Sequence, residues 1–190
     1  MRNTYYILRH GNTIYQTKKQ GTIYPWPESP LIGLTQKGRK QIKAVAGDLE
    51  SKKIDLIYCS DTTRTSQTAG IVAKELGIEM KLDSRLRDID LGIYKGRPKK
   101  EFYQVFSNPK ERFVKRPEEG ESWNDCRKRM LDFIKDIDKK HYQTTILIVS
   151  HGDPLWILEG AIRGLSDEEI LEGKIKNNLI KPGEWRELKI

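Results

Sequence analysis

Three clusters of polar residues contain the arginines and histidines best suited to catalysis in this chain. They are residues 9–11 (RHG), 60–64 (SDTTR) and 150–152 (SHG), and each follows a short apolar run. Arginine presents a planar fork of donors that fits phosphate oxygens. A neutral imidazole nitrogen can attack phosphorus, and a second, protonated imidazole can hold the oxygens of the same group. Together these side chains suit phosphoryl transfer without a metal ion, provided that the three clusters meet.

The elements that must bring the clusters together alternate between strand-like and helix-like segments. Apolar runs predict buried strands at 3–8, 54–59 and 144–149. Amphipathic or capped segments predict four helices, at 35–52, 62–76, 122–139 and 154–163. Weaker signals predict an edge strand at 79–82, a helical turn at 166–172 and a last strand at 184–189. This alternation predicts an α/β fold, a three-layer α/β/α sandwich with a mostly parallel central sheet. Because ligands bind beyond the carboxyl ends of parallel strands, we expect the clusters to share one sheet edge.

Two long segments lack a periodic pattern. Residues 15–34 are rich in Pro, Gly and Tyr and predict a loop, whereas residues 83–120 are charged, with at most a short helix near 99–107. A chain of 190 residues is long enough for one well-packed core. We therefore expect a single domain over residues 1–190, in which 83–120 is an insertion that forms a lid over the active site.

Composition narrows the class of partner. Lys and Arg number 35 against 27 for Asp and Glu, which gives a formal net charge of +8 and favours an anionic partner. No apolar run approaches the ~20 residues that span a bilayer, and the N-terminus lacks a signal-peptide cleavage site. Cys59 and Cys126 are far apart, which argues against a disulfide framework and favours the cytoplasm.

Several other phosphate chemistries do not fit the sequence. A cysteine phosphatase needs Cys-x5-Arg, but the spacing from Cys59 to Arg64 is one residue too short. No Walker loop or G-x-G-x-x-G motif is present. Nothing resembles a helix-turn-helix, an RNA-binding aromatic pair or a zinc finger, so nucleic acid is a remote option.

The ordered motifs resemble those of the histidine phosphatase superfamily, in the branch that contains cofactor-dependent phosphoglycerate mutases and small phosphatases. The resemblance covers about residues 5–165. Its motifs are residues 8–13 (LRHGNT), 34–41 (LTQKGRKQ, like L-T-x-x-G-x-x-Q), 60–69 (SDTTRTSQTA, like S-D-x-x-R-T-x-Q-T-A), 85–92 (RLRDIDLG, like R-L-x-E-x-x-x-G) and 149–152 (VSHG).

The resemblance implies a role for each matching residue. His10 would be the nucleophile that becomes phosphohistidine, and Asp88 would give a proton to the leaving oxygen and later take one from water. The residues that would bind the phosphoryl group are Arg9, Gln16, Arg64, His151 and Gly152. The resemblance implies no cofactor and no metal ion.

The sequence departs from the family pattern at three positions. Asp88 stands where the family usually has the longer Glu, and Asp90 is two places off the pattern. Gln16 stands where Asn is frequent. Asp153 follows the second histidine motif, where relatives carry a small residue. It either caps a helix that starts at Pro154 or brings a negative charge beside the pocket.

Other assignments stay open at the level of sequence. For Asp88, the alternative to a catalytic role is a surface ion pair with Arg85 or Arg87. For Arg64, the alternative to phosphate binding is a surface ion pair with Asp61.

The remaining polar residues carry weaker signals. The basic stretch that contains Arg112 and Arg116 is typical of a solvated face, although either residue can face the substrate if this stretch covers the pocket. Ser122 is expected to cap a helix, with a substrate role for Glu121 as the alternative, and His141 is expected to be exposed to solvent.

The sequence thus predicts a metal-independent phosphatase that hydrolyses phosphomonoesters of small metabolites through phosphohistidine on His10. The alternatives are a phosphoglycerate mutase and a catalytically weak family member that binds phosphorylated ligands. Mutases of this branch are typically longer, which favours hydrolysis. We expect a small phosphorylated metabolite as partner, no nucleic acid or membrane, and a cytoplasmic monomer or homodimer.

Overall fold

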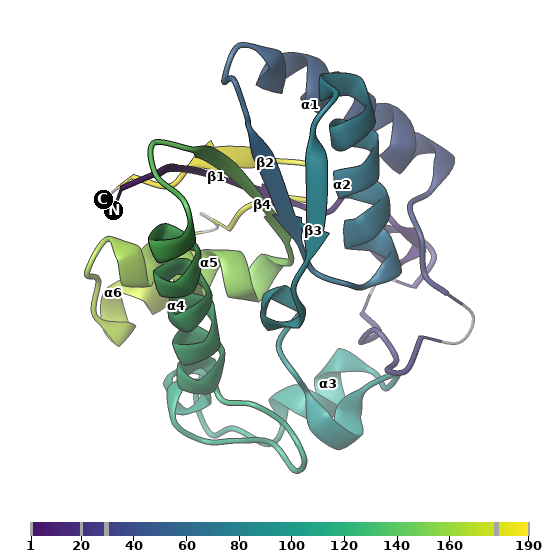
Figure 1. Ribbon diagram of the computed structural model, residues 1–190. Helices are drawn as coiled ribbons and strands as arrows, with labels where there is room; N and C mark the ends of the chain where they lie inside the picture. The colour runs from purple at the N-terminus through teal and green to yellow at the C-terminus, as the bar shows by residue number, and fades with distance from the viewer. Residues whose placement is uncertain (1, 20, 29–30, 177–178, 190) are drawn as a thin grey trace.

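A five-stranded sheet forms the centre of the molecule (Figure 1). The computed structural model describes residues 2–19, 21–28, 31–176 and 179–189, so residues 20, 29 and 30 of the predicted loop lie outside it. The strands lie in the order β3-β2-β4-β1-β5, and all pair in parallel except β5, which is antiparallel to β1. Their bounds are β1 Thr4–Arg9, β2 Leu56–Cys59, β3 Glu79–Leu82, β4 Thr145–Ser150 and β5 Trp185–Glu187. The predicted mostly parallel sheet is confirmed.

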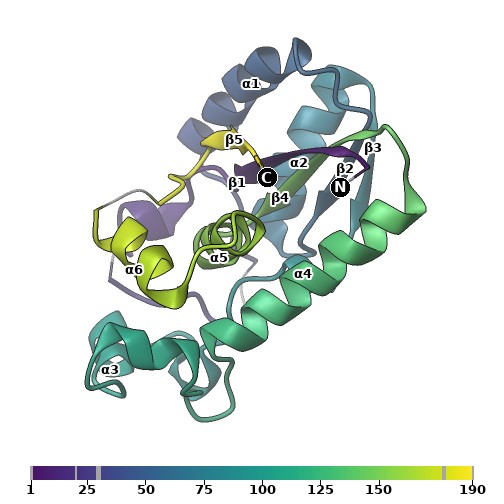
Figure 2. The ribbon, with the colours of Figure 1, turned by 90° about the vertical axis from the view of Figure 1, so that its left-hand side faces the viewer.

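Helices cover both faces of this sheet (Figure 2). On one face lie α1 (Gln36–Glu50) and α2 (Thr63–Leu76), and on the other lie α4 (Trp123–Lys140) and α5 (Gly152–Ile162). This is the predicted three-layer α/β/α arrangement. The short α3 (Lys99–Tyr103) lies within 83–120, and α6 (Asp167–Ile175) follows α5. Single 3-10 turns occur at Ile14–Gln16, Ser84–Leu86, Gly92–Tyr94 and Pro109–Phe113.

Alternating side chains of the strands form two hydrophobic cores. In β1, Tyr5 and Ile7 belong to the core beneath α4 and α5, whereas Tyr6 and Leu8 belong to the core beneath α1 and α2. Fully burying one such aliphatic side chain contributes roughly 1.5–3 kcal/mol. A slip of one residue would move every side chain to the opposite face, so this burial holds the register.

The register brings the ends of three strands to one edge of the sheet. Arg9 at the end of β1 lies opposite Ser150 at the end of β4, and Cys59 at the end of β2 lies opposite Val149. The polar residues that follow these strands therefore leave the sheet side by side, as the sequence predicted.

Capping residues set the starts of α1 and α4 and the end of α2 close to where the sequence predicts them. Thr35 accepts a hydrogen bond from the Gly38 N–H at the start of α1, and Ser122 forms a capping box with Asp125 in α4. Gly77 ends α2 in the left-handed conformation, with φ of 68°. A side-chain cap typically contributes about 1 kcal/mol. The predicted cap at Ser122 is confirmed.

One predicted helix boundary is wrong. The helix expected at 154–163 begins at Gly152 with His151 as its N-cap, because the backbone turns into the helix directly after β4. Asp153 therefore lies in the first helical turn and caps nothing. The short helix expected near 99–107 is present as the five residues of α3, and a separate 3-10 turn follows it.

The segment 83–120 lies beyond the carboxyl ends of the strands and is anchored to the body of the protein. Leu86 and Phe113 are buried in the core beneath α4 and α5. Arg129 of α4 donates hydrogen bonds to three backbone carbonyls of the segment, those of Arg85, Arg87 and Asp88, at 2.6, 2.9 and 3.1 Å. This anchor fixes the backbone that carries Asp88.

Three smaller expectations concern surface and redox properties. Cys59 and Cys126 are both buried free thiols. His141 is half-buried rather than fully exposed, because its Nε2 lies 3.0 Å from the Tyr58 hydroxyl. Among the described residues, no helix is both long enough and apolar enough to cross a membrane.

Candidate active site

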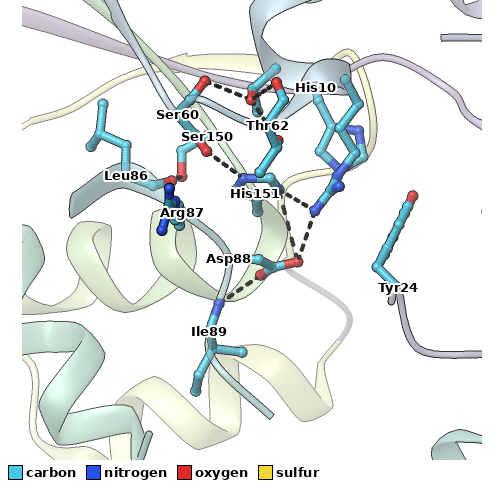
Figure 3. Close-up of polar contacts among 12 residues, drawn as sticks. His10, Tyr24, Ser60, Thr62, Leu86, Arg87, Asp88, Ile89, Ser150 and His151 are labelled. Carbon is cyan, nitrogen blue, oxygen red and sulfur yellow. Dashed lines mark hydrogen bonds and ion pairs between the residues drawn. The ribbon is translucent and has the colours of Figure 1, made fainter. Parts of the chain in front are cut away.

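His10 and His151 lie next to each other at the carboxyl edge of the sheet (Figure 3). Their ring centroids are 5.4 Å apart, and both side chains are buried. His10 Nδ1 lies 2.9 Å from the carbonyl oxygen of Gly11. A carbonyl only accepts hydrogen bonds, so Nδ1 carries the proton and Nε2 carries the lone pair. Nε2 of His10 is therefore the nitrogen available for nucleophilic attack.

His151 is held by partners that define its tautomer as well. Its Nδ1 lies 3.2 Å from Arg64 Nη2, and its Nε2 lies 3.1 Å from Ser60 Oγ. A guanidinium only donates, so Nδ1 accepts from Arg64 and Nε2–H donates to the serine hydroxyl. His151 is neutral in this arrangement.

Electrostatics favour the neutral form of both rings. Burial lowers the pKa of His10 well below its usual value, and the charges of Arg64 and Arg9 lower this pKa further. The pKa of His151 is also well below its usual value, for the same reasons and because His10 is near. The protonated His151 that the sequence predicts therefore needs the negative charge of a phosphoryl group beside it.

Arg9 and Arg64 each have a buried N–H group for which the described part of the chain offers no acceptor. Arg9 Nη1 donates to the carbonyl of Ile180 at 2.9 Å, and Arg64 Nη2 donates to His151. The Nε–H groups of both arginines are buried and find no acceptor among the described residues. An unsatisfied buried donor costs about 1–3 kcal/mol. Two such donors beside two histidines fit a site that takes an oxyanion.

Gly152 gives Arg9 the space that it occupies. A Cβ atom at residue 152 would lie 3.1 Å from Cζ of Arg9 and 3.2 Å from its Nη1. Any larger residue would therefore displace the guanidinium.

Asp88 faces both Arg64 and His151. Its Oδ2 lies 3.8 Å from Arg64 Nη2 and from His151 Nδ1, and its Oδ1 accepts from the Ile89 N–H at 3.0 Å. The side chain is 36 % exposed toward the pocket. Desolvation of the carboxyl group raises the pKa of Asp88, although the charge of Arg64 opposes this shift. A raised pKa suits a carboxyl group that must deliver a proton.

The surface pairs considered for Asp88 and Arg64 do not form. Arg85 binds Asp83 and Asp136 instead. Arg87 binds Asp61 through two hydrogen bonds, of 2.7 and 2.5 Å. Neither Asp88 nor Arg64 therefore forms the surface ion pair that was the alternative to a role in the site.

Asp153 joins two cations at the wall of the site. Its carboxylate accepts from Arg112 at 3.2 Å, Lys174 at 3.1 Å and the Trp123 indole N–H at 3.2 Å. Burial alone would raise the pKa of Asp153, but the charges of Lys174 and Arg112 hold it well below its usual range. The two cations neutralise Asp153, and together the three residues carry one net positive charge. Arg112 is buried, so the solvated face predicted for it is wrong.

One pocket of about 540 Å³ is lined by Arg9, Arg64, Asp88, Arg112, Gly152, Asp153 and Lys174. The loop after β1, the segment 83–120 and α6 supply its walls. The volume is that of a site for a small molecule, so a leaving group fits beside a phosphoryl group. Within the described part of the chain, no three His, Cys, Asp or Glu side chains gather as ligands for a metal ion.

Comparison with known proteins identifies the family. A sequence profile of the histidine phosphatase superfamily (branch 1) matches residues 5–186. The chain belongs to this superfamily. Among its relatives in the histidine phosphatase superfamily is a putative phosphoserine phosphatase 2 of Hydrogenobacter thermophilus, 31% identical over 173 residues (87% of this chain, 81% of that protein). A probable phosphoglycerate mutase GpmB of Enterobacter sp. (strain 638) is 32% identical over 165 residues, which cover 84% of this chain and 74% of that protein.

Solved structures with the same fold include two that cover most of this chain. Bacillus stearothermophilus YhfR is 30% identical with a TM-score of 0.74, over 88% of this chain and 83% of that one. A mycobacterial glucosyl-3-phosphoglycerate phosphatase gives a TM-score of 0.81 over 96% of this chain and 87% of that one. At 22% identity, the second comparison shows the fold alone.

Two other residues that the sequence singles out, Gln16 and Arg116, have partners within the protein. Gln16 lines the pocket, but its amide oxygen accepts from Thr13 N at 2.7 Å and its amide nitrogen donates to the Tyr24 hydroxyl at 3.2 Å. Arg116 pairs with Asp125 outside the pocket lining.

Glu121, for which the sequence left a substrate role as the alternative, lines the pocket and is held by other residues of the protein. Its carboxylate binds Arg129 at 2.8 Å and accepts from the Asp90 N–H at 3.1 Å. Glu121 therefore supports the backbone that carries Asp88.

Sequence reasoning missed three residues around the site. Tyr24 lies over the guanidinium of Arg64, with 4.0 Å from Cζ to the ring centroid, and Glu28 forms an ion pair with Arg64. Arg129 holds the Asp88 backbone, as described above. The two loop residues lie in an irregular segment without a periodic signal, and Arg129 is one of several cations on an amphipathic helix.

The neutral state of both histidines can be measured directly. Because burial and the two arginines lower their pKa values, the ring resonances of His10 and His151 should stay at neutral positions as pH falls through the usual range of histidine. Adding inorganic phosphate should move the His151 resonance toward its protonated position. Proton NMR of the ring signals, assigned with single His→Gln variants, provides the measurement. Ordinary titration of both rings would contradict this account of the site.

Proposed function

We propose that this histidine phosphatase hydrolyses phosphomonoesters of a small metabolite through a phosphohistidine on His10. The observation that carries the proposal is a pair of buried Nε–H groups, those of Arg9 and Arg64, which have no acceptor among the described residues and lie beside two neutral histidines. The arginines and His151 would bind the oxygens of the phosphoryl group, and Nε2 of His10 would face the phosphorus. Gln16 would add a contact through the amide N–H that Tyr24 does not take.

In the first step, the Nε2 lone pair of His10 attacks phosphorus and forms a P–N bond. The P–O bond to the leaving group breaks, and protonated Asp88 gives its proton to the departing oxygen. The products of this step are a neutral alcohol, phosphohistidine and an ionised Asp88. The positive charges of Arg9 and Arg64 stabilise the negative charge on the transferring group.

In the second step, water attacks the phosphorus and Asp88 takes a proton from it. The P–N bond breaks, its electron pair returns to His10 Nε2, and inorganic phosphate leaves. The exposed part of the Asp88 side chain lies in the pocket, from which this water would arrive. Asp88 ends the cycle protonated, as it began.

The leaving group would occupy the pocket next to Asp153, Arg112 and Lys174. Because these three residues carry one net positive charge, we propose that they favour a leaving group with a carboxylate. The name of one relative, a putative phosphoserine phosphatase 2, indicates a substrate of this kind. Residues 83–120 would act as the lid over this part of the pocket.

Transfer of phosphate between carbons is the alternative reaction, and GpmB-type relatives are named for it. Hydrolysis is supported by Asp88, whose side chain is partly exposed and lines the pocket, where water can reach it. Release of free phosphate from 3-phosphoglycerate, without 2-phosphoglycerate, would distinguish the two reactions. A catalytically weak protein would bind phosphate and release none from any substrate.

His10→Ala tests the nucleophile. We expect turnover of p-nitrophenyl phosphate to fall by at least about 10⁴-fold, since removing a nucleophile leaves only binding effects. The acid-labile phosphoenzyme, followed by acid quench with labelled substrate, should disappear. His141→Ala is the control because this histidine contacts Tyr58 away from the pocket. Full activity of His10→Ala would show that the mechanism is wrong.

Asp88→Asn tests the proton donor. An alkyl phosphate needs a proton on its leaving oxygen, whereas p-nitrophenolate leaves without one. We therefore expect kcat/KM for alkyl phosphates to fall by about 10²-fold or more and that for p-nitrophenyl phosphate by about tenfold or less. Equal losses for both substrates would exclude Asp88 as the acid.

Lys174→Gln tests the proposed contact with a carboxylate. The substitution removes one of two cations, so kcat/KM for O-phosphoserine and 3-phosphoglycerate should fall about tenfold, or ~1.4 kcal/mol. Turnover of p-nitrophenyl phosphate should change by less than about threefold. Lys176→Gln, an exposed neighbour in sequence, is the matched control. Parallel changes for charged and uncharged leaving groups would contradict the proposal.

A further inference from the structure

Glu28 places a carboxylate on one of the two arginines of the phosphoryl site. Its Oε1 forms an ion pair with Arg64 Nη1, and both side chains are only 3 % exposed. Its Oε2 accepts from the backbone N–H of Ile32 at 3.3 Å. Glu28 lines the same pocket as Arg64. The carboxylate is therefore part of the site, although the mechanism above gives it no proton to carry.

The loop that carries Glu28 is fastened around Arg64. The Tyr24 ring covers the guanidinium, and its hydroxyl lies 2.7 Å from Thr13 Oγ1. Farther along the loop, the Leu34 N–H donates to Gln67 Oε1 at 2.8 Å, one turn along α2 from Arg64. Removing two charges from water is costly, so a buried ion pair persists only with good geometry and further hydrogen bonds. These contacts supply that support.

The two arginines differ in their charge balance. Arg9 donates to a backbone carbonyl, and no carboxylate of the described residues forms an ion pair with it. Arg64 has its charge offset by Glu28 and shares an edge with His151. With both histidines neutral, Glu28 removes about half of the fixed positive charge that the guanidinium pair offers to a phosphoryl dianion.

A phosphoryl group bound to Arg64 would share one guanidinium with Glu28. Two anions on the edges of the same guanidinium repel each other, and in a buried site this repulsion weakens binding on the order of tenfold or more. The penalty applies equally to inorganic phosphate, the product that must leave at the end of each turnover. A site with two uncompensated arginines would hold this product more tightly.

We propose that Glu28 sets the affinity of the phosphoryl site for dianions and keeps it low enough for inorganic phosphate to leave. This role rests on the proposed phosphatase function, and Glu28 acts through Arg64 rather than on the reacting atoms.

Calorimetric titration of the full chain with inorganic phosphate tests the proposal without requiring turnover. Glu28→Gln keeps the size of the side chain and an acceptor for Arg64 but removes the charge. We expect its Kd for inorganic phosphate to fall about tenfold relative to the natural sequence. In the activity assay, the inhibition constant of phosphate and the KM for p-nitrophenyl phosphate should fall in parallel.

Two further variants separate charge from geometry. Glu75→Gln removes the same charge from an exposed position on α2, the helix of Arg64, and should leave phosphate affinity unchanged. Glu28→Asp keeps the charge but shortens the side chain, and its phosphate Kd should stay within about threefold of the natural protein. Glu28→Ala replaces the glutamine variant if that protein does not fold.

Each result either supports or overturns the proposed role of Glu28 in phosphate affinity. Unchanged or weaker phosphate binding in Glu28→Gln would overturn the proposal, as would equal tightening in Glu28→Asp. Failure of both uncharged variants to fold would also overturn it, because Glu28 would then be a structural residue. If no substrate is hydrolysed but Glu28→Gln still tightens phosphate, the proposed function fails and the effect of Glu28 on affinity stands.

Discussion

A buried arginine is the constraint on which the site depends. Arg64 is 2 % exposed, and a guanidinium keeps its charge in proteins, so its face and edges all need partners. Tyr24 covers its face, Glu28 and His151 take two of its nitrogens, and Asp88 approaches from a third segment. One side chain therefore joins the loop after β1, the end of β4 and the segment after β3.

The same burial has opposite effects on the pKa values of the two kinds of titratable group. Burial and the arginine charges both disfavour protonated histidine, so the lone pair of His10 stays available for attack. For Asp88, burial favours the protonated acid while Arg64 opposes it, and the net effect is a raised pKa. Groups whose pKa values are pushed apart in one pocket can act as nucleophile and acid at the same pH. Arg129 maintains this arrangement because it holds the Asp88 backbone from α4.

Much of the fold is predictable from the sequence because apolar runs define the strands and polar residues follow them directly. The positions of His10 and His151 follow from that pattern and from the parallel topology. The ion pair between Glu28 and Arg64 cannot be predicted in this way, because nothing in the sequence of an irregular loop shows that Glu28 folds back over α2. Asp153 was equally ambiguous, since a carboxylate before proline resembles a helix cap. Its actual partners come from α6 and from the 3-10 turn of Arg112, and only tertiary packing brings these elements together.

The pairing of basic residues around the pocket affects how a substrate reaches it. Arg87, Lys95 and Arg129 each bind a carboxylate, as Arg112 and Lys174 do, so the pocket wall carries far less charge than the net value of +8 suggests. Charge on the outer surface is screened over about 8 Å at physiological ionic strength. Substrate capture then depends on contacts formed inside the pocket rather than on a long-range field. Such a site can discriminate among many cellular anions of similar charge by the placement of their groups.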